Sequence, residues 1–197
     1  MEKITKLRKL FTAFDLDGYI VPKNNNFFGE YVPSAEDNLK YISNFTGSAG
    51  FAVILKKKNY IFVDGRYTIQ AEIQCGKKFQ IRNIPNEYPF NIFKKKNLNL
   101  GFDPKLHTEN SLRRLFRNSF IKLIPLNKNF IDILWKRERN LNIKPFYVIK
   151  DKDAGLKVKK KLTKLVKLIK FNKTDYLFTT ASENVAWLLN IRGQDTS

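Results

Sequence analysis

Residues 51–66 constrain the fold more than any other part of the chain. Residues 51–55 read Phe-Ala-Val-Ile-Leu and residues 60–63 read Tyr-Ile-Phe-Val, with Lys-Lys-Lys-Asn between them. Two apolar, β-prone runs joined by a short polar turn predict a β-hairpin. Asp64, Gly65 and Arg66 close the second strand, and we expect a helix to follow over residues 67–74.

The rest of the first 140 residues alternates in the same way between helix and strand patterns. Apolar residues recur at helical spacing over residues 4–14. Ser34 stands where its hydroxyl would cap the first turn of the next helix. This alternation predicts an α/β domain with a mixed sheet. The expected strands are residues 19–21, 79–84, 98–102 and 120–126, and the other expected helices are residues 34–44, 108–117 and 130–137.

A second unit is expected after the pattern pauses near residues 140–145. Residues 146–149 predict its first strand, and a strand at 176–179 and a helix at 184–190 close it. Between them lies a helix with a lysine-rich face and an apolar face, formed by Val158, Leu162, Leu165, Val166 and Ile169.

This amphipathic helix has two interpretations. One is a basic helix lying on a membrane surface. The other is an ordinary helix packed over a sheet, which we favour because a strand follows it directly. A unit of this size is marginal for a core of its own, so we expect the second domain to be cut short. The sequence shows no internal repeat.

The excess of positive charge on this chain would attract polyanions. Lys and Arg number 37 against 18 Asp and Glu, for a formal net charge of +19. Dense cations favour nucleic acid or an anionic membrane as partner. A generally lysine-rich composition is the competing explanation, and it is favoured because the lysines are spread along the chain and do not gather on one motif.

The ionisable residues exclude several classes of site. A single cysteine, Cys75, rules out an internal disulfide, and the single histidine, His107, has no Cys or His partner for zinc. Cys75 is interpreted as a small packing residue and His107 as a surface residue. The chain has neither a leader-like apolar segment nor a long apolar run, so a soluble cytoplasmic protein is expected.

Three short segments are candidates for function. Residues 45–50, Phe-Thr-Gly-Ser-Ala-Gly, suit a tight turn between a helix and a strand, and they lack the Gly-Lys-Ser/Thr of a phosphate loop. Arg66 follows a strand end, where ligands of α/β sheets tend to bind, and its planar fork could hold a carboxylate or carbonyl group. An internal Asp64–Arg66 ion pair is the alternative, and the residues alone favour it. Residues 183–195 combine core-forming residues with a charged turn, and no segment supplies a nucleophile with its base.

Together these segments resemble the amino-terminal region of the creatinase and aminopeptidase P group. The resemblance rests on residues 41–50, on residues 63–67 with Gln70 and Ala71 nearby, and on residues 186–195. These three ordered motifs span nearly the whole chain. Residues 17–22, with Glu30 and Tyr31, resemble the cytosolic aminopeptidase P branch.

The resemblance implies a fold and a role. It implies a creatinase-type amino-terminal α/β domain with a mixed sheet flanked by helices over residues 1–140, followed by the truncated start of a similar domain over residues 141–197. Members of the aminopeptidase P branch remove the first residue from peptides with proline second, and their pita-bread domain holds two Mn²⁺ ions. That domain is expected to be absent here, so this chain would bind no metal and supply no catalytic residue. Arg66 maps onto an arginine that contacts the peptide.

The resemblance therefore predicts the amino-terminal, non-catalytic portion of a cytoplasmic Xaa-Pro aminopeptidase. This portion would shape the peptide cleft and take part in a homodimer, with no membrane or nucleic-acid partner. Whether the 197-residue chain is itself an enzyme stays open. Two alternatives also remain: a free-standing polyanion-binding protein that uses the +19 charge, and an inactive binding or dimerisation module.

Overall fold

The structure is a computed structural model that describes residues 2–137 and 144–194. It divides into two compact units, Met1–Arg139 and Asn140–Ser197, which are described separately. The expected boundary at residues 140 and 141 lies outside the described residues.

The first unit is built on one six-stranded mixed sheet in the order β4-β3-β2-β1-β5-β6. The expected hairpin forms the antiparallel pair β2 and β3, and β1 pairs antiparallel with β2. The pairs β1–β5, β3–β4 and β5–β6 are parallel. The mixed sheet is therefore confirmed. The strands are β1 Gly18–Pro22, β2 Gly50–Leu55, β3 Asn59–Asp64, β4 Gln80–Ile84, β5 Leu98–Phe102 and β6 Ile121–Pro125.

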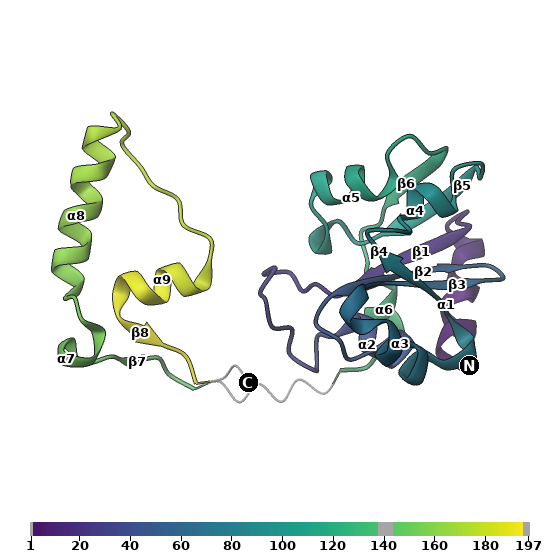
Figure 1. Ribbon diagram of the computed structural model, residues 1–197, viewed down its shortest axis with the longest axis horizontal. Helices are drawn as coiled ribbons and strands as arrows, with labels where there is room; N and C mark the ends of the chain where they lie inside the picture. Colours follow the sequence, from purple (N-terminus) through teal and green to yellow (C-terminus); the bar gives the residue numbers. More distant parts are fainter. Residues whose placement is uncertain (1, 138–143, 195–197) are drawn as a thin grey trace. The chain divides into compact units, whose positions relative to one another are not determined.

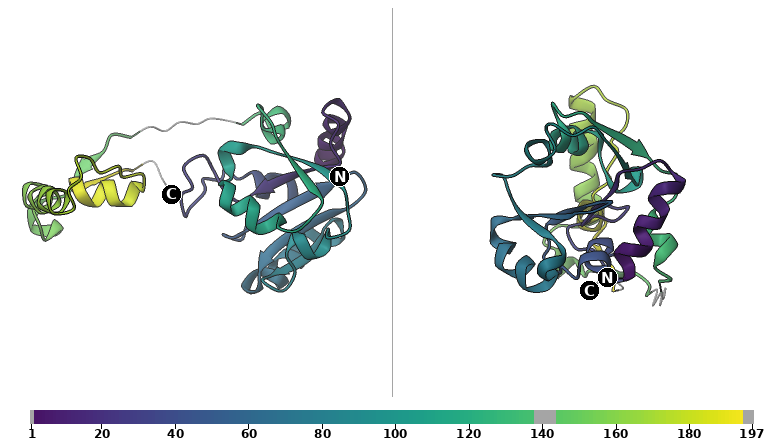
Figure 2. Two further views of the ribbon diagram at one scale, coloured as in Figure 1. Left: turned by 90° about the horizontal axis from the view of Figure 1, so that it is seen from above. Right: turned by 90° about the vertical axis from the view of Figure 1, so that its right-hand side faces the viewer.

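Helices cover both faces of this sheet (Figure 1). One face packs against α1, α2, α3 and α6, and the other against α4 and α5. Helix α1 lies beside α6 (Figure 2), where the rings of Phe14 and Phe130 are 5.0 Å apart. The helices are α1 Glu2–Ala13, α2 Asn38–Ser43, α3 Thr68–Cys75, α4 Pro89–Ile92, α5 Glu109–Phe116 and α6 Phe130–Leu134.

The two hydrophobic cores explain why the central strands are apolar at every position. In β3, Ile61 and Val63 face one core while Tyr60 and Phe62 face the other. Successive side chains of a strand point to opposite faces, so a strand covered on both sides needs apolar residues throughout. The residue pattern of the hairpin thus follows directly from its central place in the sheet.

Helix α2 begins later than the sequence predicted. The expected cap, Ser34, lies outside the helix, and Asp37 caps it instead, because its carboxylate accepts a hydrogen bond from the Lys40 backbone N–H at 2.9 Å. Aspartate caps helices as well as serine does, and here it is also buried.

The second unit contains two short strands, β7 Tyr147–Val148 and β8 Ile191–Arg192, which pair antiparallel. Its helices are α7 Asp151–Ala154, α8 Val158–Phe171 and α9 Ser182–Leu189. The strand expected at residues 176–179 is wrong: this segment pairs with no strand in the described part of the chain. Among the described residues of this unit, only Lys161 and Asn190 are buried.

Candidate functional site

Arg66 lies at the carboxyl end of β3, in the short turn of 3-10 helix Gly65–Tyr67. Its Nε donates to Asp64 Oδ1 at 2.9 Å and its Nη2 to Asp64 Oδ2 at 3.3 Å. The guanidinium holds the pKa of the Asp64 carboxyl below its usual value through these hydrogen bonds. The internal ion pair that the residues alone favoured is therefore present. The Arg66 side chain is nevertheless 72% exposed, so its remaining donors face solvent.

The loop over residues 45–49 packs beside this turn because β2 and β3 are paired. Gly50 lies opposite Val63 in the ladder, which brings the two motifs together. The Ser48 hydroxyl lies 2.7 Å from the Tyr67 hydroxyl across this junction. The guanidinium carbon of Arg66 lies 5.4 Å from the centre of the Tyr67 ring.

Phe45 explains why the loop carries a glycine at position 47. The Phe45 side chain is fully buried, and its ring meets that of Tyr67 edge-on at 5.9 Å. A Cβ atom at Gly47 would lie 2.2 Å from Cζ of Phe45, closer than atoms can approach. Only glycine therefore allows the loop to fold back over the ring.

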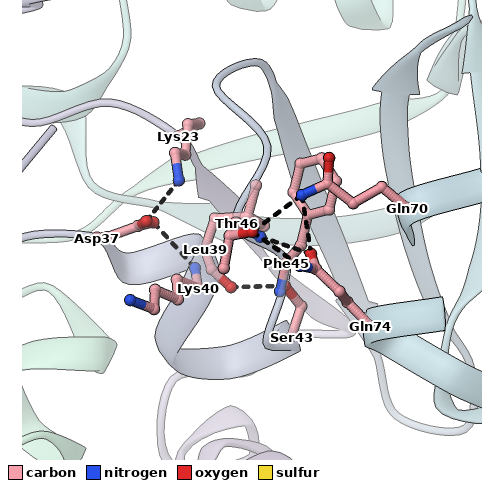
Figure 3. Close-up of polar contacts among 9 residues, drawn as sticks. All are labelled: Lys23, Asp37, Leu39, Lys40, Ser43, Phe45, Thr46, Gln70 and Gln74. Carbon is pink, nitrogen blue, oxygen red and sulfur yellow. Dashed lines mark hydrogen bonds and ion pairs between the residues drawn. The ribbon is translucent and has the colours of Figure 1, made fainter. Parts of the chain in front are cut away.

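Three polar side chains tie the same loop to helix α3 (Figure 3). The backbone N–H of Thr46 donates to Gln74 Oε1 at 2.8 Å. The Thr46 hydroxyl accepts from Gln70 Nε2 at 2.9 Å and from Gln74 Nε2 at 2.8 Å. The loop is thus hydrogen-bonded to the helix that follows Arg66.

Sequence reasoning identified Arg66 but did not predict the contact between Ser48 and Tyr67 or the hydrogen bonds between Thr46 and the two glutamines. The signal was present in the hairpin, because the strand that follows residues 45–49 pairs with the strand that precedes Arg66. A hairpin aligned from its turn places these two segments side by side.

The third motif lies in the second unit, and only part of it is described. Helix α9 carries Trp187, and Asn190 caps the helix in the left-handed conformation. Arg192 is exposed, and Asp195 lies outside the described residues.

His107 is not the surface residue that the sequence suggested. Its Nε2 is buried without a hydrogen-bond partner in the part of the chain that the structure describes, and its ring packs edge-on against Phe102 at 5.7 Å. Burial lowers the pKa of His107 from 6.5 to about 4. The protonated form is disfavoured in this setting, so His107 is a packing residue at neutral pH.

The first prediction concerns the pH dependence of stability. The unfolded chain binds a proton at His107 below pH 6.5 and the folded chain only near pH 4. The contribution of His107 to the free energy of unfolding has its full value above pH 6.5. It falls by about 2 to 3 kcal/mol as the pH drops to 4. His107→Leu should remove this part of the decline in urea unfolding measured from pH 7 to 4. If the free energy of unfolding fell equally with pH in the unsubstituted protein and in His107→Leu, His107 would not be the group responsible.

Cys75 is buried, and burial raises the pKa of its thiol to about 11. It is therefore a thiol at neutral pH, as its interpretation as a packing residue requires. Within residues 2–137 and 144–194, no three His, Cys, Asp or Glu side chains lie close enough together to hold a metal ion. Every helix in the same residues is too short or too polar to traverse a lipid bilayer.

These features define an α/β protein whose first unit presents a fixed, charged turn at the end of a central strand. Residues 3–132 match the Creatinase/Prolidase N-terminal domain family, and residues 137–197 match a second family of the same description. The chain belongs to the creatinase/prolidase N-terminal domain family, and the resemblance seen in its motifs is confirmed.

Relatives of the chain agree with this assignment. The chain is 32% identical to a probable Xaa-Pro aminopeptidase P from Coprinopsis cinerea and 30% identical to aminopeptidase P1 from Lotus japonicus, over 98% of its length in both cases. It spans 33% and 31% of those proteins, about a third of each.

A solved structure has a similar fold. The X-prolyl aminopeptidase of Caenorhabditis elegans, described as a cytosolic enzyme with a di-nuclear active site, matches with a TM-score of 0.84 and 27% identity. The match covers 99% of this chain and 35% of that chain. The creatinase-type fold, with the start of a second domain, is thus confirmed.

Proposed function

We propose that this chain is the amino-terminal, non-catalytic portion of an Xaa-Pro aminopeptidase, which removes the first residue from peptides with proline second. The observation that carries the proposal is the similarity to such enzymes over nearly the whole chain. The described residues gather no metal-ligand set, so the two Mn²⁺ ions of the proposed enzyme would be held by other residues. We assign residues 1–140 to the first domain and residues 141–197 to part of a second.

Arg66 is the proposed peptide contact. Its guanidinium is held by Asp64 on one side and is largely solvent-exposed on the other. A guanidinium that keeps free N–H groups can donate to a peptide carbonyl or carboxylate. The proposed enzyme is a cytoplasmic homodimer, and Arg66 would form one wall of its cleft. Polyanion binding gains no specific support, because the candidate site pairs its arginine with an aspartate.

Activity measurements test the first part of this proposal. The purified chain, given an Ala-Pro-Ala peptide and Mn²⁺, is expected to release no alanine. Release that persists after contaminating peptidases are excluded would show that the chain is itself catalytic, and the proposal would be wrong.

The contact from Arg66 is tested by peptide binding to the chain. Arg66→Ala should weaken binding of Ala-Pro-Ala about tenfold, because a charge-assisted hydrogen bond is lost. Binding would be followed through the backbone amide signals of ¹⁵N-labelled protein, which both the unsubstituted protein and the variant carry.

The matched control is Arg113→Ala, because Arg113 is also 72% exposed and paired with a carboxylate, that of Glu109. This variant should bind the peptide as the unsubstituted protein does. Equal affinities of the Arg66 and Arg113 variants would contradict the role of Arg66.

A further inference from the structure

Asp64 binds one edge of the Arg66 guanidinium and leaves the opposite edge unbound. Nε and Nη2 lie on the same edge, and they donate to the two carboxylate oxygens of Asp64 at 2.9 and 3.3 Å. Within residues 2–137 and 144–194, the Arg66 side chain donates to no other residue. The opposite edge, formed by Nη1 and the second N–H of Nη2, therefore presents two parallel N–H groups.

Further contacts favour one direction for this unbound edge. The Asp64 carboxylate also accepts from the Arg66 backbone N–H at 2.9 Å, as the cap of the 3-10 turn. The guanidinium carbon lies 5.4 Å from the centre of the Tyr67 ring, and that ring packs edge-on against the buried ring of Phe45. The guanidinium thus has a carboxylate on one edge and an aromatic ring beside it.

Stability does not account for the Asp64–Arg66 pair. The two side chains are 43% and 72% exposed, and exposed ion pairs contribute little to the free energy of unfolding. The hydrogen bonds from Arg66 hold the pKa of the Asp64 carboxyl below its usual value, so both partners are charged at neutral pH. The main effect of the pair is therefore on the orientation of Arg66.

Two parallel N–H groups match the two oxygens of a carboxylate better than the single oxygen of a peptide carbonyl. We propose that Asp64 is a positioning residue, which orients the unbound edge of Arg66 for bidentate binding of the terminal carboxylate of a short peptide. The site then prefers a peptide with a free carboxyl terminus to one that is blocked. This inference rests on the proposed function, in which Arg66 contacts the peptide.

The test compares Ala-Pro-Ala with Ala-Pro-Ala amide, which differ only in the terminal carboxylate, by calorimetric titration of the whole chain. The unsubstituted protein should bind the free acid about tenfold more tightly than the amide. Arg66→Ala should remove this difference, and Arg113→Ala should keep it. A preference that persists in Arg66→Ala would come from the general positive charge of the chain and would overturn the proposal.

The same titrations separate this inference from the proposed function. If the unsubstituted protein bound both peptides equally and Arg66→Ala weakened both, the contact from Arg66 would stand and the preference for a carboxylate would be wrong. If neither peptide bound, the contact from Arg66 would be wrong, and this inference with it.

Asp64→Asn tests the positioning role, because charge and orientation predict opposite results. Asparagine can still accept the Arg66 backbone N–H, but its Nδ2 is a donor and cannot accept from the guanidinium. Removal of a negative charge alone would strengthen binding of the free acid. Loss of orientation should instead weaken it about threefold, with the affinity for the amide unchanged. Equal or tighter binding of the free acid overturns the proposal, and an equal loss for both peptides shows a purely structural role and also overturns it.

Discussion

Replacing Asp37 by alanine should lower the free energy of unfolding by about 3 to 5 kcal/mol, because the change leaves a buried ammonium group unpaired. Asp37 forms an ion pair with Lys23, and the two side chains are 5% and 10% exposed. The same carboxylate caps helix α2 through Lys40 N–H (Figure 3), so two interactions are lost at once.

Chemical denaturation followed by circular dichroism measures this loss. Glu109→Ala is the matched control, since Glu109 forms an ion pair with Arg113 at the exposed surface of α5. Exposed pairs contribute little to stability, so the control should unfold at nearly the same denaturant concentration as the unsubstituted protein. If Asp37→Ala and Glu109→Ala lowered stability equally, the buried pair would not have the role assigned to it.

Replacing Phe45 by alanine should also cost about 3 to 5 kcal/mol, because it removes a large, fully buried ring from the first core. The loop over residues 46–49 folds over that ring, with Gly47 in direct contact. The variant should therefore also loosen the loop, and amide exchange at Thr46 should become faster.

Phe27→Ala is the control for this change. Phe27 is 83% exposed, so its removal should leave stability within about 0.5 kcal/mol of the starting value. A Phe45 variant as stable as the Phe27 variant would show that the ring is dispensable, contrary to its position in the core.

Features fixed by local sequence were predicted well. The hairpin could be predicted because its two strands and its turn are contiguous, and residues 98–102 form a strand as expected. The start of α2 was misplaced because Ser34 and Asp37 both suit a helix cap, and only tertiary packing, with Lys23 against Asp37, selects the second.

Features that depend on distant partners were predicted less well. A strand at residues 176–179 was expected from composition, but a strand forms only when another strand pairs with it. The burial of His107 likewise depends on Phe102 and on the packing around it.

The family could be identified from the motifs because their order and separation are specific, and the family match confirms it. The geometry around Arg66 needed the structure, because Ser48 and Tyr67 meet only through the register of β2 and β3. The role of Arg66 in holding a peptide stays a prediction.

The order of strands in the sheet has a consequence for synthesis on the ribosome. Strands β1, β2 and β3 are neighbours both in sequence and in the sheet, so they can assemble early. The second core also needs Leu112, Leu115 and Phe116 from α5. Until that helix has emerged, one side of the nascent sheet presents Ile20, Val53 and Phe62 to water. A chaperone that binds apolar surfaces could bind this face after β1, β2 and β3 have assembled and before α5 has emerged.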